Sequence, residues 1–488
     1  VSQASDKRIA GGRGMTTKSY VKASYRMTGM PQYDGNPLIE ALPAILTDID
    51  VVRYVGHLPP KPNSAELELP AKLRSHGINR LKDVVIPLDI HLELEDNFSQ
   101  LIRYGYTGRQ PFDPATIRSR IPTKGVQKFS GFKSSANIMT LIGLSGMGKT
   151  TALDAIAKLY PQVIAHSKYK GKIFIETQVV WLKVECPHDG SLGGFCAGFF
   201  ASLDIALGIH KYSDIVAKHP SVSVMLTTIT QLCKAFYIGA IIIDEMQHLN
   251  SRGGKDREKL LNFFVALSND TGVPLVYVGT NAMLPLFSGV LRNARRAVGM
   301  GEVTFDRFSF DAPFWDLLVN RLWEYDWTGQ ATPMTDELFS KIYDLTQGNT
   351  DFLVKLLMLA QRFVITENLQ SITPTILQRV YDDQMRLLHK PIEALRSGDP
   401  DQVADFEDMM PTKDQIIQMM NYDLKRRANR ANMSLYTNNV IENDAKKSKV
   451  SGSSVVPLSV SSDIHLAAGE DVTNALQERG WVDENSEW

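Results

Sequence analysis

Short apolar runs alternate with longer amphipathic stretches between residues 136 and 311. The runs that could form strands are 138–142, 179–184, 240–244, 273–279 and 302–306. Such runs, short and nearly free of polar alternation, predict strands covered on both faces, as in a parallel sheet. The stretch 256–267 instead repeats its apolar side chains every three or four residues, which predicts a helix that covers the sheet. The pattern therefore predicts an α/β fold with a five-stranded parallel sheet.

The hydrophobic pattern changes on both sides of this segment. Beyond residue 332 it becomes wholly helical, and it predicts helices over 335–346, 351–368 and 373–388, the last opened by Thr373 as N-cap and Pro374 as first residue. Upstream, residues 31–70 carry many prolines without a sustained period, which predicts an extended arm. A strand and a helix are expected within 81–106.

These changes divide the chain into five segments. We expect a disordered leader or tag over 1–14, an N-terminal extension over 15–120, the α/β core over 121–311, a helical lid over 312–398 and a C-terminal extension over 399–488. The last segment has basic runs and Ser/Gly/Asn-rich stretches, which predict a tail that only partners hold in place.

The first predicted strand leads directly into a glycine-rich loop. Residues 143–150 read Gly-Leu-Ser-Gly-Met-Gly-Lys-Thr, the complete G-x-x-x-x-G-K-[ST] pattern between a strand and a helix. Glycines let backbone N–H groups surround a β-phosphate at the positive end of the following helix. The pattern predicts an ATP site in which Lys149 reaches the β and γ oxygens and Thr150 binds Mg²⁺. Its residues would be Gly143, Ser145, Gly146, Gly148, Lys149, Thr150 and Thr151.

The third predicted strand ends in two acids, Asp244 and Glu245. Open α/β sheets bind ligands at the carboxyl ends of their strands. Asp244 would hold the Mg²⁺ shell together with Thr150, and Glu245 would polarise the attacking water, so the pair is interpreted as a Walker B segment. A solvated acidic pair is the alternative, which the upstream loop disfavours.

Polar residues near the last two strands could complete a hydrolytic site. Thr280 and Asn281 directly follow the fourth strand, where they would orient water against the γ-phosphate, although a simple turn is the alternative. Arg292, Arg295 and Arg296 precede the fifth strand, the place of the arginine finger that AAA+ proteins extend into the next subunit. Arg295 and Arg296 are favoured as the catalytic finger, with contact to DNA or solvent as the alternative.

Composition limits the class of protein. The chain has 488 residues, 43% of them hydrophobic, which predicts two or three folded domains. It has no apolar run of 18 residues and no signal-like leader, so a cytoplasmic protein is expected. The three cysteines, Cys186, Cys196 and Cys233, lack paired spacing and are expected to be buried hydrophobes rather than disulfides or zinc ligands.

Charge is distributed unevenly although the net charge is only −1. Between residues 118 and 172 the chain has ten basic residues and one acid, Asp154. Such an excess favours phosphate binding, with an ordinary solvated face as the alternative. Without a base-reading helix, contact with the DNA backbone alone is expected. The candidates are Lys168, Lys170, Lys172, Ser191, Arg252 and Lys255.

Several segments resemble TnsC, the AAA+ regulator of TnsABC-type cut-and-paste transposons, some of them CRISPR-associated. The resemblance covers roughly residues 20–410 and is most specific at 36–43 (Asn-Pro-Leu-Ile-Glu-Ala-Leu-Pro) and 393–398 (Glu-Ala-Leu-Arg-Ser-Gly). Five further segments also contribute to the resemblance: Gly105-Tyr106-Thr107-Gly108-Arg109 and residues 160–164, 243–249, 261–265 and 294–296. An AAA+ core with a helical lid is the fold that it implies.

The resemblance also implies a function. It indicates an ATP-hydrolysing homo-oligomer, a ring or helical filament, that wraps double-stranded DNA without sequence preference and uses ATP and Mg²⁺. It would bridge a TniQ- or TnsD-type targeting protein to the transposase subunits TnsA and TnsB, docked by the N- and C-terminal extensions. The alternatives are an ATP-gated assembly scaffold with negligible turnover and a helicase-loader-like protein. The water-activating Glu245 favours hydrolysis over the scaffold.

Overall fold

A five-stranded, all-parallel sheet forms the centre of the protein in a computed structural model that describes residues 20–120, 133–218, 220–251, 254–288, 299, 301–330, 332–399 and 402–403. The strand order is β10-β2-β9-β8-β7. Their bounds are Ile138–Gly143 (β2), Trp181–Glu185 (β7), Ala240–Asp244 (β8), Leu275–Gly279 (β9) and Glu302–Phe305 (β10). The predicted parallel sheet is confirmed, with its strands at or near the expected positions.

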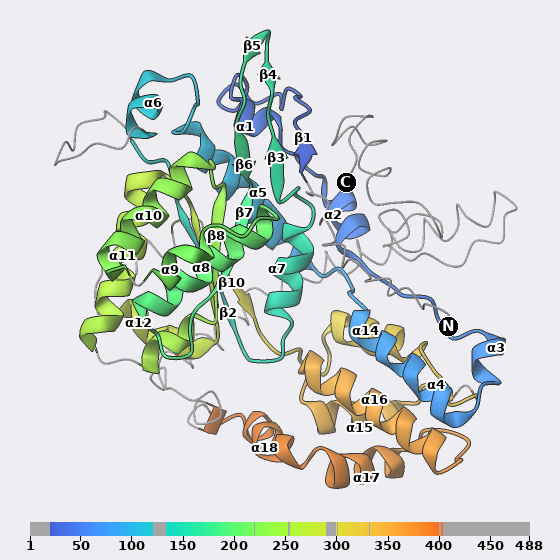
Figure 1. The fold of residues 1–488 in the computed structure, drawn as a ribbon. Coiled ribbons are helices and arrows are strands. Elements are labelled where there is room, and N and C mark those ends of the chain that lie inside the picture. Colours follow the sequence, from blue (N-terminus) through green and yellow to red (C-terminus); the bar gives the residue numbers. More distant parts are fainter. Residues whose placement is uncertain are drawn as a thin grey trace, which may run out of the picture.

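Helices cover both faces of this sheet (Figure 1). α5 (Asp89–Thr107) and α7 (Lys149–Ala157) cover one face, and α8 (Leu192–Ala206), α10 (Val222–Ala235) and α11 (Gly254–Thr271) cover the other. Because successive side chains of a strand point to opposite faces, Ile242 joins the first core while Ile241 and Ile243 join the second. Short helices α9 (Ser213–Ala217) and α12 (Pro285–Ser288), with the 3₁₀ turns η2 (Met246–Ser251) and η3 (Asn281–Met283), complete the core.

A two-stranded ribbon projects from the core between α7 and β7 (Figure 1). It comprises β3 (Val163–Ala165), β4 (Lys168–Tyr169), β5 (Lys172–Ile173) and β6 (Thr177–Val179), and β1 (Val21–Lys22) pairs with β3. The predicted strand 179–184 is therefore two strands in two different sheets, β6 and β7. Hydrophobicity alone could not separate them, because Val179, the last residue of β6, and Val180 continue without a break into Trp181 and Leu182 of β7.

The helical lid follows the sheet. It contains α14 (Pro313–Trp323), α15 (Asp336–Thr346), α16 (Thr350–Thr366), α17 (Pro374–Gln384), η4 (Arg386–Leu388) and α18 (His389–Ser397). The predicted helices 335–346 and 351–368 are confirmed to within two residues. The third begins as predicted, with the Thr373 hydroxyl capping the helix and Pro374 at its first position, but it ends at Gln384 and continues as η4.

The prediction of an extended arm over 31–70 is wrong. The segment forms α1 (Pro37–Glu40), α2 (Asp48–Val55) and α3 (Ser64–Leu67), followed by α4 (Ala71–Gly77) and η1 (Ile78–Asp83). The side chains of Asn36, Thr47 and Asn63 cap the first three helices, so local capping starts them where hydrophobic periodicity is too short to be read.

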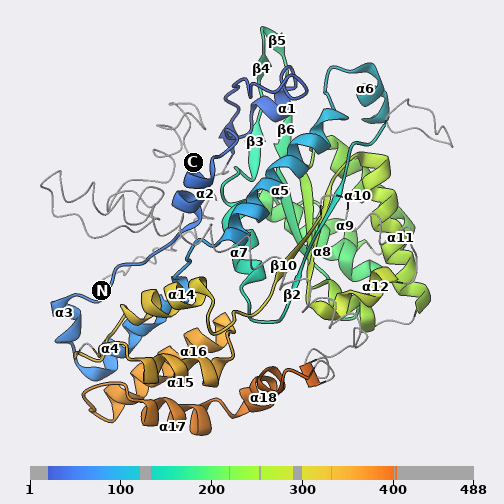
Figure 2. The ribbon, with the colours of Figure 1, turned by 180° about the vertical axis from the view of Figure 1, so that it is seen from behind.

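The strand expected within 81–106 is also absent from the described residues. Val85 makes only an isolated antiparallel bridge with His57, because no longer partner strand lies beside it. The helix expected there is α5. α4 and η1 pack against α16 of the lid, and α5 packs against the sheet. The N-terminal segment therefore contacts both the sheet and the lid (Figure 2).

Arg109 anchors this N-terminal segment to the sheet, after α5 and before α6 (Pro114–Arg120). Arg109 is 4% exposed. Its guanidinium donates to the carbonyl of Gly105 in α5 and to those of Ile238 and Gly239, just before β8. Burial lowers the pKa of Arg109 to about 10, so the group remains charged at neutral pH. The Tyr106 hydroxyl donates to the carbonyl of Tyr237 at 2.8 Å. The Gly105–Arg109 motif therefore fastens α5 to the start of the Walker B strand.

The cysteines and the apolar character of the helices can be compared with the sequence-based expectations. Cys186, Cys196 and Cys233 are buried and free, as predicted. Among the described residues, no helix combines the length and the apolar character needed to cross a bilayer.

We expect Arg109→Leu to lower the free energy of unfolding by about 3 kcal/mol, because hydrogen bonds from a charged donor are lost and buried carbonyls are left without it. Chemical denaturation of the nucleotide-free protein measures this. Arg118→Leu, at an exposed position of α6, is the control and should change the unfolding free energy by less than about 0.5 kcal/mol. Equal effects of the two variants would contradict the anchoring role.

Candidate functional site

The glycine-rich loop joins β2 to α7. Gly148 is the N-cap of α7 with φ of 87°, a left-handed conformation that glycine adopts without strain. At Gly143 a Cβ would lie 2.0 Å from the carbonyl oxygen of Phe305, so only glycine permits this approach of β2 to β10. Lys149 is 9% exposed. Its ammonium donates to the carbonyls of Gly143 and Leu144 at 2.8 Å each. The loop therefore curls around its own lysine at the N-terminus of α7.

The two acids lie at the adjacent carboxyl end of β8. The Thr150 hydroxyl donates to Asp244 Oδ2 at 3.2 Å, and the Glu245 N–H donates to Asp244 Oδ1 at 2.9 Å. A hydroxyl and a carboxylate that meet in this way fit Mg²⁺, which prefers oxygen ligands. Thr150 and Asp244 would hold the ion, which when bound would neutralise the charge of the phosphates.

Glu245 leaves the strand in a strained conformation. Its φ is 58°, in the left-handed region that costs a non-glycine residue about 1 kcal/mol. The turn directs its carboxylate toward Gln247, whose side-chain amide donates to Glu245 Oε2. The amide oxygen of Gln247 in turn accepts from the Thr280 N–H at 3.2 Å. Gln247 thus connects the proposed water-activating acid to the end of β9.

These residues line one cavity of about 220 Å³. Ser145, Gly146, Gly148, Lys149, Thr150, Thr151, Asp244, Glu245 and Thr280, all predicted from the sequence, surround it together with Gln247 and Gly279. Gly143 lies at its base and contributes the carbonyl that Lys149 contacts. Thr280 itself caps η3, since its hydroxyl accepts from the Ala282 N–H. Sequence analysis missed Gln247 as a site residue, although it lies only two residues after Glu245.

A second, largely apolar cavity of about 530 Å³ adjoins the loop at Gly146, Met147 and Gly148. Its walls come from residues 81–91 of the N-terminal segment, from β10, and from α14 and α16 of the lid. Apolar cavities of this kind suit a flat nucleobase. His91 lines it, accepts the Leu88 N–H at Nδ1 and is neutral because burial lowers its pKa to about 4. Sequence analysis missed this cavity, since no motif marks residues 81–91.

The lid touches the phosphate loop directly. The Thr350 hydroxyl and the Asp351 N–H both donate to the carbonyl of Gly146, at 2.6 and 3.0 Å. The Asn349 amide donates to the carbonyl of Ser145 at 2.9 Å and also caps α16. Lys355 forms an ion pair with Asp351 at 2.5 Å and lines the larger cavity. The start of α16 therefore holds two carbonyls of the loop.

Comparison with known proteins agrees with this geometry. Residues 132–287 match the family described as "AAA domain". The fold is an AAA+ P-loop fold. No curated protein sequence matches the chain.

Solved structures resemble it at low identity. The ADP form of the Aeropyrum pernix ORC2 protein is 13% identical with a TM-score of 0.36, over 51% of this chain and 62% of that one. The A. pernix ORC1 protein in complex with DNA is 14% identical with a TM-score of 0.37, over 68% and 83%. Thermotoga maritima RuvB, a Holliday junction branch migration motor, is 15% identical with a TM-score of 0.31, over 56% and 75%. The chain thus spans about three fifths of the length of the ORC2 protein.

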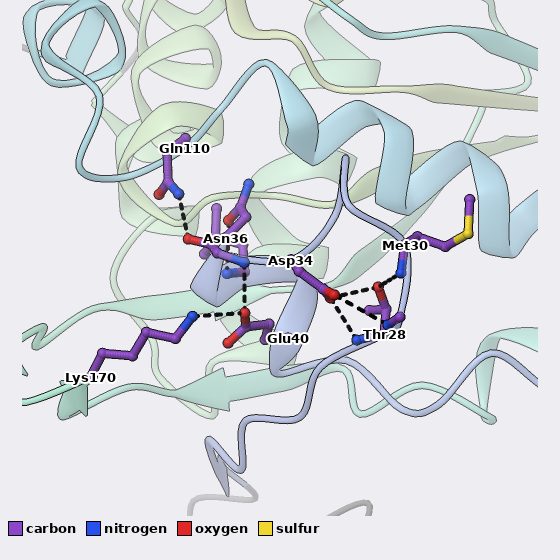
Figure 3. Close-up of polar contacts among 10 residues, drawn as sticks. Thr28, Met30, Asp34, Asn36, Glu40, Gln110 and Lys170 are labelled. Carbon is purple, nitrogen blue, oxygen red and sulfur yellow. Dashed lines mark hydrogen bonds and ion pairs between the residues drawn. The ribbon is translucent and has the colours of Figure 1, made fainter.

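The residues predicted to contact DNA fall in different places. Lys168 and Lys172 lie exposed on the ribbon, with the ammonium of Lys172 5.6 Å from the ring centroid of Phe112. Lys170, at the ribbon's turn, forms a 3.2 Å ion pair with the buried carboxylate of Glu40, as Figure 3 shows. The Glu40 carboxylate also accepts the Gly35 N–H at 2.7 Å.

The remaining predicted site residues lie on another element or outside the described part of the chain. Ser191 caps α8, where its hydroxyl accepts the Gly194 N–H at 3.1 Å. Arg252, Arg295 and Arg296 lie outside the described residues, as does the side chain of Lys255.

We expect Thr350→Val to weaken ATP binding about fivefold, because one lid-to-loop hydrogen bond of about 1 kcal/mol is lost while the side chain keeps its shape. Titration with a fluorescent ATP derivative measures the dissociation constant. Thr366→Val, at the exposed far end of α16, is the matched control and should bind like wild type. Wild-type affinity of Thr350→Val would mean that this contact does not support the loop.

Proposed function

We propose that this chain is an ATP-hydrolysing AAA+ regulator of DNA transposition, similar to TnsC, that works in the bacterial cytoplasm. The observation that carries the ATPase part is the convergence of Lys149, Thr150, Asp244 and Glu245 on one cavity. Lys149 and the loop amides would bind the phosphates, Thr150 and Asp244 would hold Mg²⁺, and Glu245 would activate water. The apolar cavity beside Gly146 would take the adenine.

Residue resemblance supports the role in transposition. The segments 36–43 and 393–398 match patterns specific to TnsC, and neither belongs to the nucleotide motifs. In this proposal the protein forms a ring or filament on double-stranded DNA and bridges a TniQ- or TnsD-type protein to TnsA and TnsB. Arg295 or Arg296 would act on the nucleotide of a neighbouring subunit, where the phosphoryl group needs delocalised positive charge.

The basic residues of the ribbon support DNA binding. Lys168 and Lys172 are exposed on an element that projects from the core, where they could track a phosphate backbone without reading bases. Lys170 could join them only by leaving Glu40.

A second candidate function is an ATP-gated scaffold with negligible turnover. The hydrogen bond from Gln247 to Glu245 favours it, because a carboxylate held by an amide is less free to take a proton from water. In that case nucleotide would lock an assembly that is not cleared by hydrolysis.

Glu245→Gln separates the two candidates. The amide keeps the size of the side chain but cannot act as a base, so ATP binding should survive while steady-state hydrolysis falls by about a hundredfold or more. Assemblies on duplex DNA should outlast those of wild type after ATP dilution. Lys149→Ala, which should lose ATP binding altogether, is the control. Equal disassembly rates for Glu245→Gln and wild type would instead support the scaffold.

DNA binding should depend on salt and hardly on sequence, because phosphates are contacted. We expect Lys168→Ala to weaken binding to every duplex alike and to lower the slope of log affinity against log salt by about 1. Lys72→Ala, exposed on α4, should leave the slope unchanged. Binding measured on several random duplexes at four salt concentrations checks this. A strong preference for one duplex would contradict backbone recognition.

A further inference from the structure

Lys183 contacts the proposed metal site from a strand that carries neither the phosphate loop nor the two acids. It lies on β7, next to β8, and its side chain is 22% exposed. Its ammonium lies 2.8 Å from Asp154 Oδ1 of α7 and 3.3 Å from Asp244 Oδ2. One cation therefore connects the helix after the phosphate loop to the Walker B aspartate.

The contacts converge on a single carboxylate oxygen. Asp244 Oδ2 faces the Lys183 ammonium and also accepts the Thr150 hydroxyl at 3.2 Å. Asp154 follows Thr150 by one helical turn, so both project from the same face of α7 toward this point. Two carboxylates, one on α7 and one at the end of β8, therefore face the ammonium of Lys183.

A fixed positive charge next to Asp244 acts on a divalent cation in two ways. It holds the carboxylate toward Thr150, which favours binding, and it repels the incoming charge, which opposes it. The two carboxylates differ in burial: the side chain of Asp244 is 6% exposed and that of Asp154 is 44% exposed. Asp154 is thus a second partner that can keep Lys183 when Asp244 turns to a metal ion.

We propose that Lys183 is a positioning residue that sets the Mg²⁺ affinity of the site by sharing its charge between Asp154 and Asp244. Without metal, the lysine neutralises Asp244. Bound Mg²⁺ would compete with Lys183 for Asp244, and the ammonium would then keep Asp154 as its partner. The proposal rests on the nucleotide site described above. It predicts that removing the charge of Lys183 and removing the charge of Asp154 change the Mg²⁺ affinity in opposite directions.

The test is a Mg²⁺ titration of the binding of a fluorescent ATP derivative. Lys183→Met removes the repelling charge, so the half-saturating Mg²⁺ concentration should fall about fivefold. Asp154→Asn leaves the charge of Lys183 to Asp244 alone, so that concentration should rise about fivefold. Lys183→Arg keeps the charge and should remain within about twofold of wild type.

Opposite shifts of the half-saturating Mg²⁺ concentration support the proposal. If Lys183 were only a structural bridge, Lys183→Met and Asp154→Asn would shift that concentration in the same direction. Shifts in one direction, or unchanged midpoints, would overturn the proposal. Should Lys183→Met fail to fold by its thermal midpoint, Lys183→Gln takes its place in the same comparison with Asp154→Asn.

A second measurement separates this proposal from the proposed function. Mn²⁺ binding without nucleotide can be followed by the electron paramagnetic resonance signal of the ion. The Mn²⁺ affinity should be highest for Lys183→Met, intermediate for wild type and lowest for Asp154→Asn. If wild type does not bind ATP, the ATPase assignment fails, and the Mn²⁺ order still decides the role of Lys183. If wild type binds ATP with Mg²⁺ dependence and the variants match it, only the role of Lys183 fails.

Discussion

Burial of the parallel sheet on both faces is the constraint on which the rest of the structure depends. Every side chain of β8 from Ala240 to Asp244 is buried, between α5 and α7 on one face and α8, α10 and α11 on the other. Polar groups can hardly be placed within such strands, because each would lose its hydration. They gather instead at the carboxyl edge, where the loop after β2, Asp244 at the end of β8 and Thr280 after β9 meet.

The lid and the N-terminal segment extend this edge into a site with three walls. α16 holds the carbonyls of Ser145 and Gly146, which belong to the phosphate loop itself. The N-terminal segment is fixed to the sheet by Arg109 and to the lid by the Tyr325 hydroxyl, which donates to the carbonyl of Pro59 at 2.7 Å. The lid helix α16 therefore contacts the loop carbonyls and also lines the apolar cavity, so a shift of the lid would change both together.

Charges at this edge are arranged in pairs rather than as isolated groups. Lys149 is held by carbonyls, Lys183 by Asp154 and Asp244, and Glu245 by the amide of Gln247. Each of these contacts can be exchanged for one with a phosphate, a metal ion or a water. These partners keep each charged group hydrogen-bonded in a region of low dielectric constant, where a buried charge without a partner would cost free energy.

The sequence by itself determined the parallel sheet, the phosphate loop, the two acids at the end of β8 and the three main lid helices. These follow from local rules: uninterrupted apolar runs form buried strands, and the G-x-x-x-x-G-K-[ST] spacing fixes a loop before a helix. Only the tertiary structure decided that 31–70 is helical, that 179–184 is shared by two sheets, and that residues 81–91 wall a cavity. The positions of Gln247, Thr350 and Lys183 were likewise decided by segments that lie far apart in the chain, such as β7 and α7. A lone polar residue carries no period and no spacing, so its partner becomes known only when the strands and helices have packed.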